Sequence, residues 1–172
     1  MHRGILLAID PGDVQSAFCF MDIDTYRPLY FAKEKNEDAM AYMIMYCVNP
    51  QNNVTNVAIE MLQSYGMPVG KTTLFTALWC GRFHERLSDY VENIDYIYRK
   101  DEKICLCGQM RAKDSNIRQA LIDRFAKFDF KQGKGSKDNP DWFFGFKADM
   151  WAAAAVGTTW IDAKKGLYQL QN

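Results

Sequence analysis

The sequence predicts an α/β fold in which a mixed five-stranded sheet, an antiparallel meander plus parallel strands, is flanked by helices. Three strand-like apolar runs follow one another at the N-terminus with only tight turns between them. Further along, helical patterns alternate with two more strand-like runs. The 172 residues, 48% of them hydrophobic, suffice for one packed core, and no repeat or linker divides the chain, so residues 1–172 are expected to form a single domain.

The meander comes first. Gly4–Asp10 is a run of branched apolar residues that ends on a carboxylate, directly before Pro11-Gly12. Gln15–Ile23 and Arg27–Lys33 follow as the second and third strands, separated by a turn at Asp24-Thr25. Such closely linked strands pair antiparallel.

The middle of the chain adds two helices and a fourth strand. Asn36 is expected to cap a helix that runs to Cys47, and Val54–Glu60 is the fourth strand, again ending on a carboxylate. After a loop over 61–70, a helix spans Lys71–Asp89. Its apolar residues form either two stripes, one for the core and one for a partner, or a single broad core face: Leu74, Leu78, Cys80, Phe83 and Leu87.

The last third contains one more strand and mostly helix. Ile94–Tyr98 reads as the fifth strand, with a short helical turn near Lys103-Ile104 behind it. A helix from Asp114 or Ser115 to Phe125 follows. The stretch from Lys127 to Phe144, rich in Gly and Lys, is expected to be mobile, and an alanine-rich helix spans Asp149–Trp160.

Three acids stand at positions that can meet. The carboxyl ends of neighbouring parallel strands share one rim of a sheet, so Asp10 and Glu60 meet there if the first and fourth strands are adjacent. Asp149, at the start of the last helix, can reach the same place. Taken singly, each acid is better explained by a turn, cap or surface role. Together they would repel strongly unless they bound cations, and carboxylate oxygens favour Mg²⁺ or Mn²⁺. Two such ions can support phosphodiester hydrolysis.

Composition excludes several classes of protein. Five cysteines, with no C-x-x-C pair, indicate neither a disulfide framework nor a zinc knuckle, and point to a reducing cytoplasm. No apolar run is long enough for a membrane helix. The formal net charge is zero, yet residues 99–147 hold 12 Lys and Arg against 7 Asp and Glu. This basic segment is either a phosphate-facing surface or ordinary solvated charge.

One stretch imitates a nucleotide-binding loop. Gly66–Thr72 follows a strand and opens a helix, but only three residues separate Gly66 from Gly70, one fewer than in the Walker A loop. Pro68 also lacks a backbone amide for phosphate. No nucleotide cofactor is therefore expected. The loop is either a simple connector or lies near a cut site, where Gln63, Tyr65 and Lys71 would contact DNA.

Four segments together resemble the RuvC family of Holliday junction resolvases, closest to its phage-encoded branch. They are Ile9-Asp10-Pro11-Gly12, Ile59-Glu60, Gly108–Arg124 and Ala148–Ala153, and their order and spacing extend the resemblance over nearly the whole chain. The resemblance implies an RNase H-like fold, a homodimer, and Mg²⁺-dependent nicks across four-way DNA, in a bacterial cytoplasm and encoded by phage or prophage. It makes Asp10, Glu60 and Asp149 the catalytic residues and the ligands of two Mg²⁺, for which Mn²⁺ can substitute.

The resemblance has one departure. Cellular members of the family usually carry a fourth acid or a histidine three residues before the last aspartate, where this chain has Phe146. A second metal site is then weaker, or completed by another acid: Asp13, Asp114 or Asp141. By resemblance, Arg111, Lys113 and Arg118 are DNA contacts. Lys131, Lys134 and Lys137 are looser candidates, because a flexible basic loop can follow a DNA backbone without reading its sequence.

Fold and metal chemistry do not fix the substrate. Besides a resolvase of branched DNA, the sequence allows an RNase H-like nuclease for RNA–DNA hybrids or flaps. It also allows a non-catalytic member that only binds nucleic acid.

Overall fold

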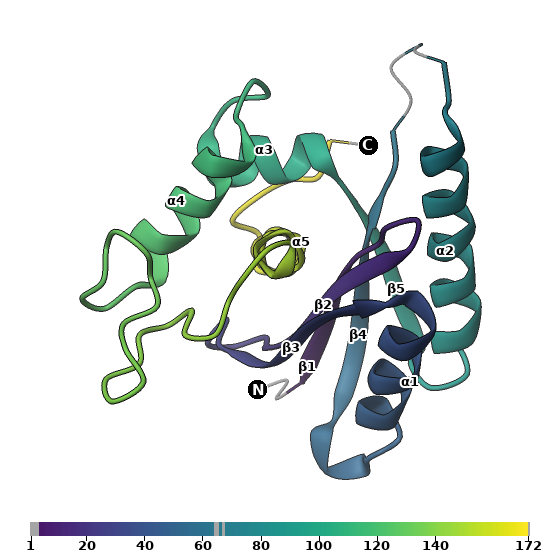
Figure 1. Cartoon of the computed structure of the whole chain (residues 1–172), viewed down its shortest axis with the longest axis horizontal. Coiled ribbons are helices and arrows are strands. Elements are labelled where there is room, and N and C mark those ends of the chain that lie inside the picture. The colour runs from purple at the N-terminus through teal and green to yellow at the C-terminus, as the bar shows by residue number, and fades with distance from the viewer. Residues whose placement is uncertain (1–3, 64–65, 67, 172) are drawn as a thin grey trace.

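The computed structural model describes residues 4–63, 66 and 68–171. Five strands form one mixed sheet, as the sequence predicted, and their order is β3-β2-β1-β4-β5 (Figure 1). The strands are β1 (Ile5–Asp10), β2 (Gln15–Asp22), β3 (Pro28–Lys35), β4 (Val54–Met61) and β5 (Asn93–Tyr98). β1, β2 and β3 pair antiparallel, whereas β1 pairs parallel with β4, and β4 with β5.

Helices cover both faces of this sheet. They are α1 (Asn36–Cys47), α2 (Lys71–Leu87), α3 (Arg99–Cys107), α4 (Asp114–Phe125) and α5 (Met150–Lys164), with a short 3₁₀ turn, η1, at Pro50–Asn52. α1 and α2 lie on one face, and α5 lies on the other with α3 and α4 outside it (Figure 1). None of the helices built from the described residues is both long and apolar enough to span a membrane.

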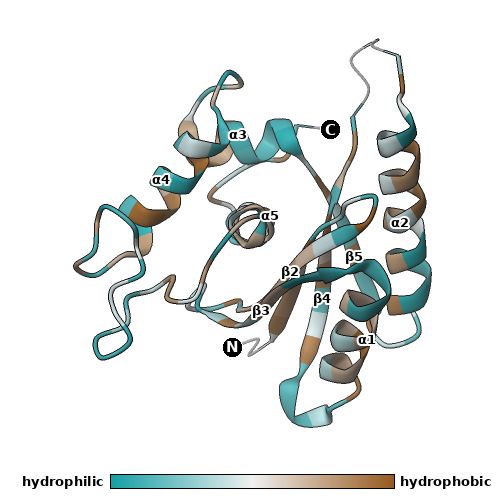
Figure 2. Cartoon of the chain, viewed as in Figure 1, coloured by the Kyte–Doolittle hydropathy of each residue, from teal (hydrophilic) through white to brown (hydrophobic). Residues whose placement is uncertain are grey.

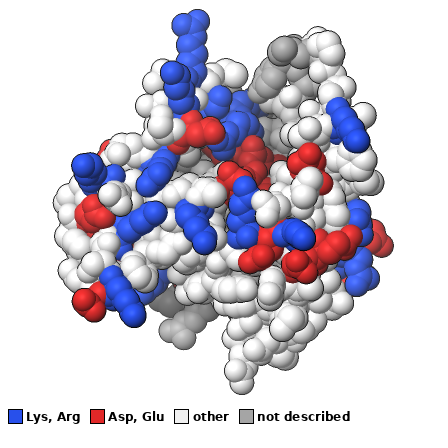
Figure 3. Space-filling model, viewed as in Figure 1, with Lys and Arg blue, Asp and Glu red and all other residues white. Residues whose placement is uncertain are grey.

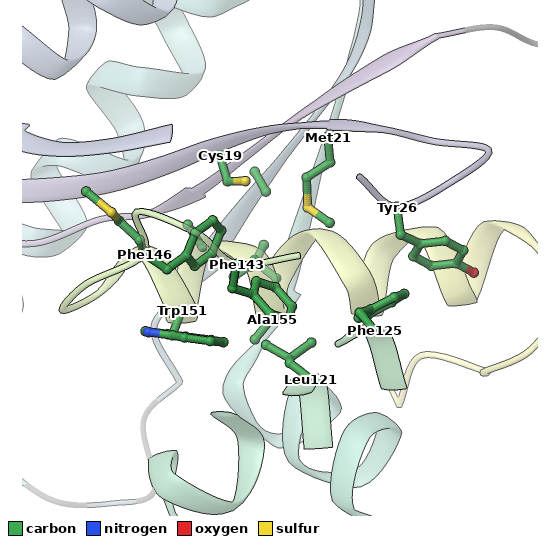
Figure 4. Packing of buried hydrophobic residues seen from close by; sticks show 14 of the residues in the cluster. Cys19, Met21, Tyr26, Leu121, Phe125, Phe143, Phe146, Trp151 and Ala155 are labelled. Atoms are coloured by element: carbon green, nitrogen blue, oxygen red, sulfur yellow. The ribbon is translucent and has the colours of Figure 1, made fainter. Parts of the chain in front are cut away.

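The alternation of side chains along the strands divides the core into two layers. Leu7, Ile9 and Val57 pack toward α1 and α2, whereas Ala8 and Ala58 pack toward α5. Figure 2 shows the apolar positions concentrated on the central strands and on the helix sides that face them. The layer around α5 is rich in aromatic rings, and the ring centroids of Phe143, Phe146 and Trp151 lie 4.7–5.3 Å apart there (Figure 4).

α5 lies unusually close to the sheet because of its small residues. A Cβ atom added at Gly157 would come within 3.0 Å of the Ala8 Cβ and would collide with the Met21 sulfur. Ala153, Ala154 and Ala155 on the same helix are fully buried or nearly so. The alanine-rich composition of this segment therefore reflects a close helix–sheet approach rather than helix propensity alone.

Two local predictions differ from the structure. α3 is a helix of nine residues rather than a short turn. Its buried positions include Asp101 and Glu102, so its inner face carries no apolar periodicity for the sequence to reveal. Asn36 is not the cap of α1, because the cap position is Lys35. The Asn36 side chain is buried and bonds to the β1–β2 turn instead.

The basic loop over 127–144 was predicted to be mobile, but two carboxylates hold it in place. Asp141 accepts hydrogen bonds from the backbone amides of Lys127, Phe128 and Asp129 at 2.7–3.0 Å, and from its neighbour Trp142 at 2.7 Å. Asp129 likewise accepts from the amides of residues 132, 134 and 135. The Gly and Lys composition suggested mobility because it does not show where these amides find their acceptors.

These bonds give Asp141 a pH-dependent role in stability. Burial opposes ionisation, but the four amide donors outweigh it and lower the Asp141 pKa to about 2. The stabilisation is therefore complete above the unfolded pKa of about 4 and is lost as pH falls through about 2.

We expect Asp141→Asn to lower the free energy of unfolding by about 2 kcal/mol at pH 7, because one amide group cannot accept from four donors. Denaturant melts at pH 7 and pH 2.5 test this, and the difference from wild type should shrink at the lower pH. Asp138→Asn, an exposed change in the same loop, is the control. Equal effects of the two changes would contradict the role given to Asp141.

Candidate active site

Asp10 and Glu60 lie side by side at the rim of the sheet. β1 and β4 are neighbours, and their parallel register aligns Ile9 with Ile59, so the next residue on each strand is an acid. Both acids alternate onto the same face as Ala8 and Ala58, toward α5. The two side chains are close enough that Glu60 raises the pKa of Asp10. The condition that the sequence analysis set for their meeting is fulfilled.

Burial and neighbouring negative charge oppose the ionisation of both carboxyl groups. Burial raises the pKa of Asp10, and the charges of Glu60 and Asp149 raise it further. Burial raises the pKa of Glu60 as well, while the nearby Arg99 guanidinium lowers both values. The pair is thus strained electrostatically as a dianion, and a cation would relieve the strain.

Three hydrogen bonds among Gly12, Ser16 and Asn36 fix the turn that follows Asp10. The Gly12 amide donates to Ser16 Oγ at 3.1 Å, and this hydroxyl donates to Asn36 Oδ1 at 2.6 Å. Asn36 Nδ2 returns a bond of 3.0 Å to the Gly12 carbonyl. The first residue of α1 therefore holds the end of β1, and with it Asp10, in place.

Asp149 lies near this pair but turns to a different partner. It occupies the cap position of α5, yet its carboxylate makes no capping bond. Instead it forms an ion pair with Lys33 of β3. Its charge acts on Asp10 and on Glu60. In the described part of the chain, no three His, Cys, Asp or Glu side chains are close enough to hold a metal ion as they stand.

Phe146, at the position where the resemblance led us to look for an acid or a histidine, belongs to the core. Phe146 is 1% exposed and packs on Phe31, with ring centroids 4.3 Å apart, and on Trp151. Asp141, one of the substitutes considered, is occupied by the four loop amides. Asp13 lies in the turn after β1, and Asp114 is exposed and bonded to Arg99. Asp114 is the nearer of these two to the site electrostatically, since its charge raises the pKa of Glu60.

Sequence reasoning missed Arg99 and Glu102 at the start of α3. Arg99 Nη1 lies 2.6 Å from Glu102 Oε2, and Nη2 bonds to Asp114. Glu102 is fully buried, its Oε1 has no hydrogen-bond partner, and burial together with the charge of Glu60 raises its pKa. The available signal was position: Arg99 directly follows β5, the third parallel strand that ends at this rim.

The predicted DNA contacts lie on both sides of the acids. Lys71 is exposed at the start of α2, with its ammonium 5.7 Å from the Phe75 ring centre. Arg111 and Lys113 are exposed just before α4, and Arg118 stacks over Trp151, two residues beyond Asp149, at 4.6 Å. Lys131 and Lys137 are exposed and Lys134 is half-buried on the 127–144 loop. Tyr65 lies outside the described residues.

Charge is unevenly spread over the face in Figure 3. Basic side chains predominate over the half formed by α3, α4 and the 127–144 loop, whereas acidic side chains gather in the middle of the face and continue in a row toward the side of α1 and α2. The net charge of zero thus conceals a basic region beside an acidic one.

Comparison with known structures identifies the fold. Thermus thermophilus RuvC has a TM-score of 0.63 and 14% identity, covering 97% of this chain and 99% of RuvC. The chain has an RNase H-like fold. RuvC in complex with a Holliday junction substrate gives the same TM-score of 0.63 at 12% identity, covering 98% of this chain and 99% of that one. The large terminase nuclease of the thermophilic phage G20c is more distant, at a TM-score of 0.44 and 12% identity over 92% of this chain and 82% of that one. No family model and no curated protein matches the sequence.

Proposed function

We propose that this protein is a metal-dependent endonuclease that resolves four-way or otherwise branched DNA. The observation that carries the proposal is the contact between Asp10 and Glu60 at the ends of neighbouring parallel strands in an RNase H-like fold. The fold alone does not define a substrate. The acids supply the reason to expect hydrolysis, and the basic surface beside them supplies the reason to expect nucleic acid.

The donor set suits Mg²⁺ or Mn²⁺. All the ligands on offer are carboxylate oxygens, which these hard ions prefer, and the Asp10 and Glu60 pair resists full ionisation without a cation. Asp10, Glu60 and Asp149 would hold the ions. When bound, such ions activate water for attack on a phosphodiester and stabilise the leaving oxygen. Arg99, whose charge lowers the pKa of both Asp10 and Glu60, would stabilise their ionised forms rather than ligate.

Basic residues on a fixed loop suit a DNA backbone. The amide bonds to Asp129 and Asp141 hold the 127–144 loop in one conformation, so its lysines are presented to phosphates without a large ordering cost. Arg111 and Lys113 extend this basic side toward α3, and Lys71 lies across the acids on α2. The solved RuvC complex contains a Holliday junction, and a branched substrate is what this proposal assigns to the present chain.

The outer side of α2 suits a second copy of the chain. Leu74, Phe75 and Leu78 are 60%, 45% and 55% exposed, whereas Trp79, Cys80, Phe83 and Leu87 face the core. Gly81 lies about one turn beyond Leu78, and nothing lies within 4 Å of where its Cβ would be, so another helix can approach there. A homodimer would place two sets of acids on one junction, as paired nicks require.

The first prediction concerns Asp10. We expect Asp10→Asn to slow cleavage of a synthetic four-way junction in Mg²⁺ by on the order of 100-fold or more, because a metal ligand is removed. Junction binding measured in Ca²⁺ should stay within about twofold of wild type. Asp89→Asn, an exposed change on the opposite side of the sheet, is the control.

The choice of substrates decides between this proposal and its alternatives. Paired, symmetric nicks in the junction, with linear duplex left intact, support resolution. Preferential cleavage of an RNA–DNA hybrid or a flap would assign another nuclease activity. Tight junction binding without cleavage in Mg²⁺ or Mn²⁺ would make this a binding protein.

The second prediction concerns the basic loop. We expect alanine at Lys131, Lys134 and Lys137 together to weaken junction binding and to reduce the slope of log affinity against log salt by roughly 1 to 3. Fluorescence anisotropy between 50 and 200 mM salt measures both quantities. Alanine at Arg86, Lys164 and Lys165 removes the same charge elsewhere and is the control. An unchanged slope would remove the loop from the interface.

The third prediction concerns the α2 surface. We expect wild type to be a dimer by light scattering and Leu78→Glu to be a monomer, because two buried carboxylates would face each other across a two-fold axis. Met45→Glu, at a residue 67% exposed on α1, should leave the dimer intact. A monomeric wild type at micromolar concentration, or a dimeric Leu78→Glu, would exclude this surface.

A further inference from the structure

Lys33 belongs to the same row of side chains as the two strand acids. Across the sheet, Asp10 of β1 is paired with Ala17 of β2, and Ala17 with Lys33 of β3. Residues paired in this way point to the same face, so Lys33 shares the α5 face with Asp10 and Glu60. Ala17, the residue between them, has the smallest side chain that a strand position can offer besides glycine. The lysine thus lies two strand spacings, roughly 10 Å, from Asp10, with no bulky side chain between.

The ammonium group of Lys33 is bound to the carboxylate of Asp149. An aspartate at a helix cap position usually accepts from the first amides of its own helix, but Asp149 makes no such bond. The preceding residue, Ala148, has a φ of 45°, in the left-handed region that alanine seldom adopts. The backbone at this point is therefore held in an uncommon conformation just where the carboxylate is directed to Lys33.

The ion pair of Lys33 with Asp149 lies beside Asp10 and Glu60, the other two acids expected to hold a metal ion. Asp10 and Glu60 end neighbouring parallel strands and share the α5 face with Lys33, yet in the described residues no three acids converge on one point. The lysine side chain is 28% exposed and that of Asp149 is 52% exposed, so both can rotate without disturbing the core. A lysine ammonium and a divalent ion at the same carboxylate repel each other, so each weakens the binding of the other.

We propose that Lys33 is the resident cation of the metal-free site, a positioning residue that holds Asp149 and releases it when a divalent ion binds. The inference rests on the proposed function, since it assumes that Asp149 is a metal ligand. Binding of the ion and release of the Lys33–Asp149 pair are then one coupled event. Metal affinity is lowered by the lysine, and Asp149 remains neutralised whenever the ion is absent.

Metal binding in the absence of DNA tests this directly. Isothermal titration with Mn²⁺ should show that Lys33→Met binds about tenfold more tightly than wild type, the scale expected for a single charge acting on a divalent ion at roughly 6 Å in water. Lys33→Arg keeps the positive charge and should resemble wild type. Lys35→Met, two residues along the same strand, removes an equal charge and is the matched control.

A double-mutant cycle shows whether the effect passes through Asp149. In an Asp149→Asn background, Lys33→Met should give a clearly smaller gain in Mn²⁺ affinity than in wild type. An equal gain in both backgrounds would mean that Lys33 acts only as a distant charge, and would overturn the inference. Unchanged or weaker Mn²⁺ binding by Lys33→Met would also overturn it.

The same titrations separate this inference from the proposed function. If wild type binds Mn²⁺ and Asp10→Asn does not, the metal site stands, and the Lys33 variants alone decide the inference. If wild type binds no Mn²⁺ at millimolar concentration, the proposed function fails and the inference fails with it. Melting curves in EDTA confirm that each variant is folded.

Discussion

The parallel pairing of β1 with β4 is the constraint on which the rest of this site depends. Each strand alone ends on an acid of no special significance, and only their alignment places Asp10 against Glu60. Ionising this buried pair of acids is unfavourable, because burial and neighbouring negative charge raise the pKa of both Asp10 and Glu60. Around it the chain has gathered cations of its own: Arg99 from the end of β5 and Lys33 from β3.

Much of this arrangement was open to prediction because the signal was local. Apolar runs that end on Asp10 and Glu60, with a return helix between the two strands, lead to parallel neighbours and a shared rim. The sequence also offered a second apolar stripe on α2 as one of two interpretations, and Leu74 and Leu78 do repeat at helical spacing away from the buried residues.

What could not be predicted depends on distant partners. The place of Lys33 follows from the register of β2 with β3, which shifts between Phe20 and Met21 and which no residue pattern reveals. The order of the 127–144 loop depends on amides that find Asp141 up to 14 residues away. α3 was underestimated because charged residues occupy its buried side, where Glu102 pairs with Arg99. In the first two cases the deciding contact joins residues far apart in the sequence, whereas α3 lacked an apolar pattern because the pair of Arg99 and Glu102 occupies its buried side.

The close approach of Gly157 to Ala8 and Met21 limits which motions can accompany metal binding at the site. A helix pressed this closely onto a sheet cannot slide or tilt without creating overlap, so α5 is fixed relative to β1. If Asp149 leaves Lys33 for a metal ion, it can do so only by side-chain rotations at the N-terminus of α5, which take picoseconds to nanoseconds. No slow conformational change would then precede metal binding, and its rate would be set by how quickly the ion loses its water ligands.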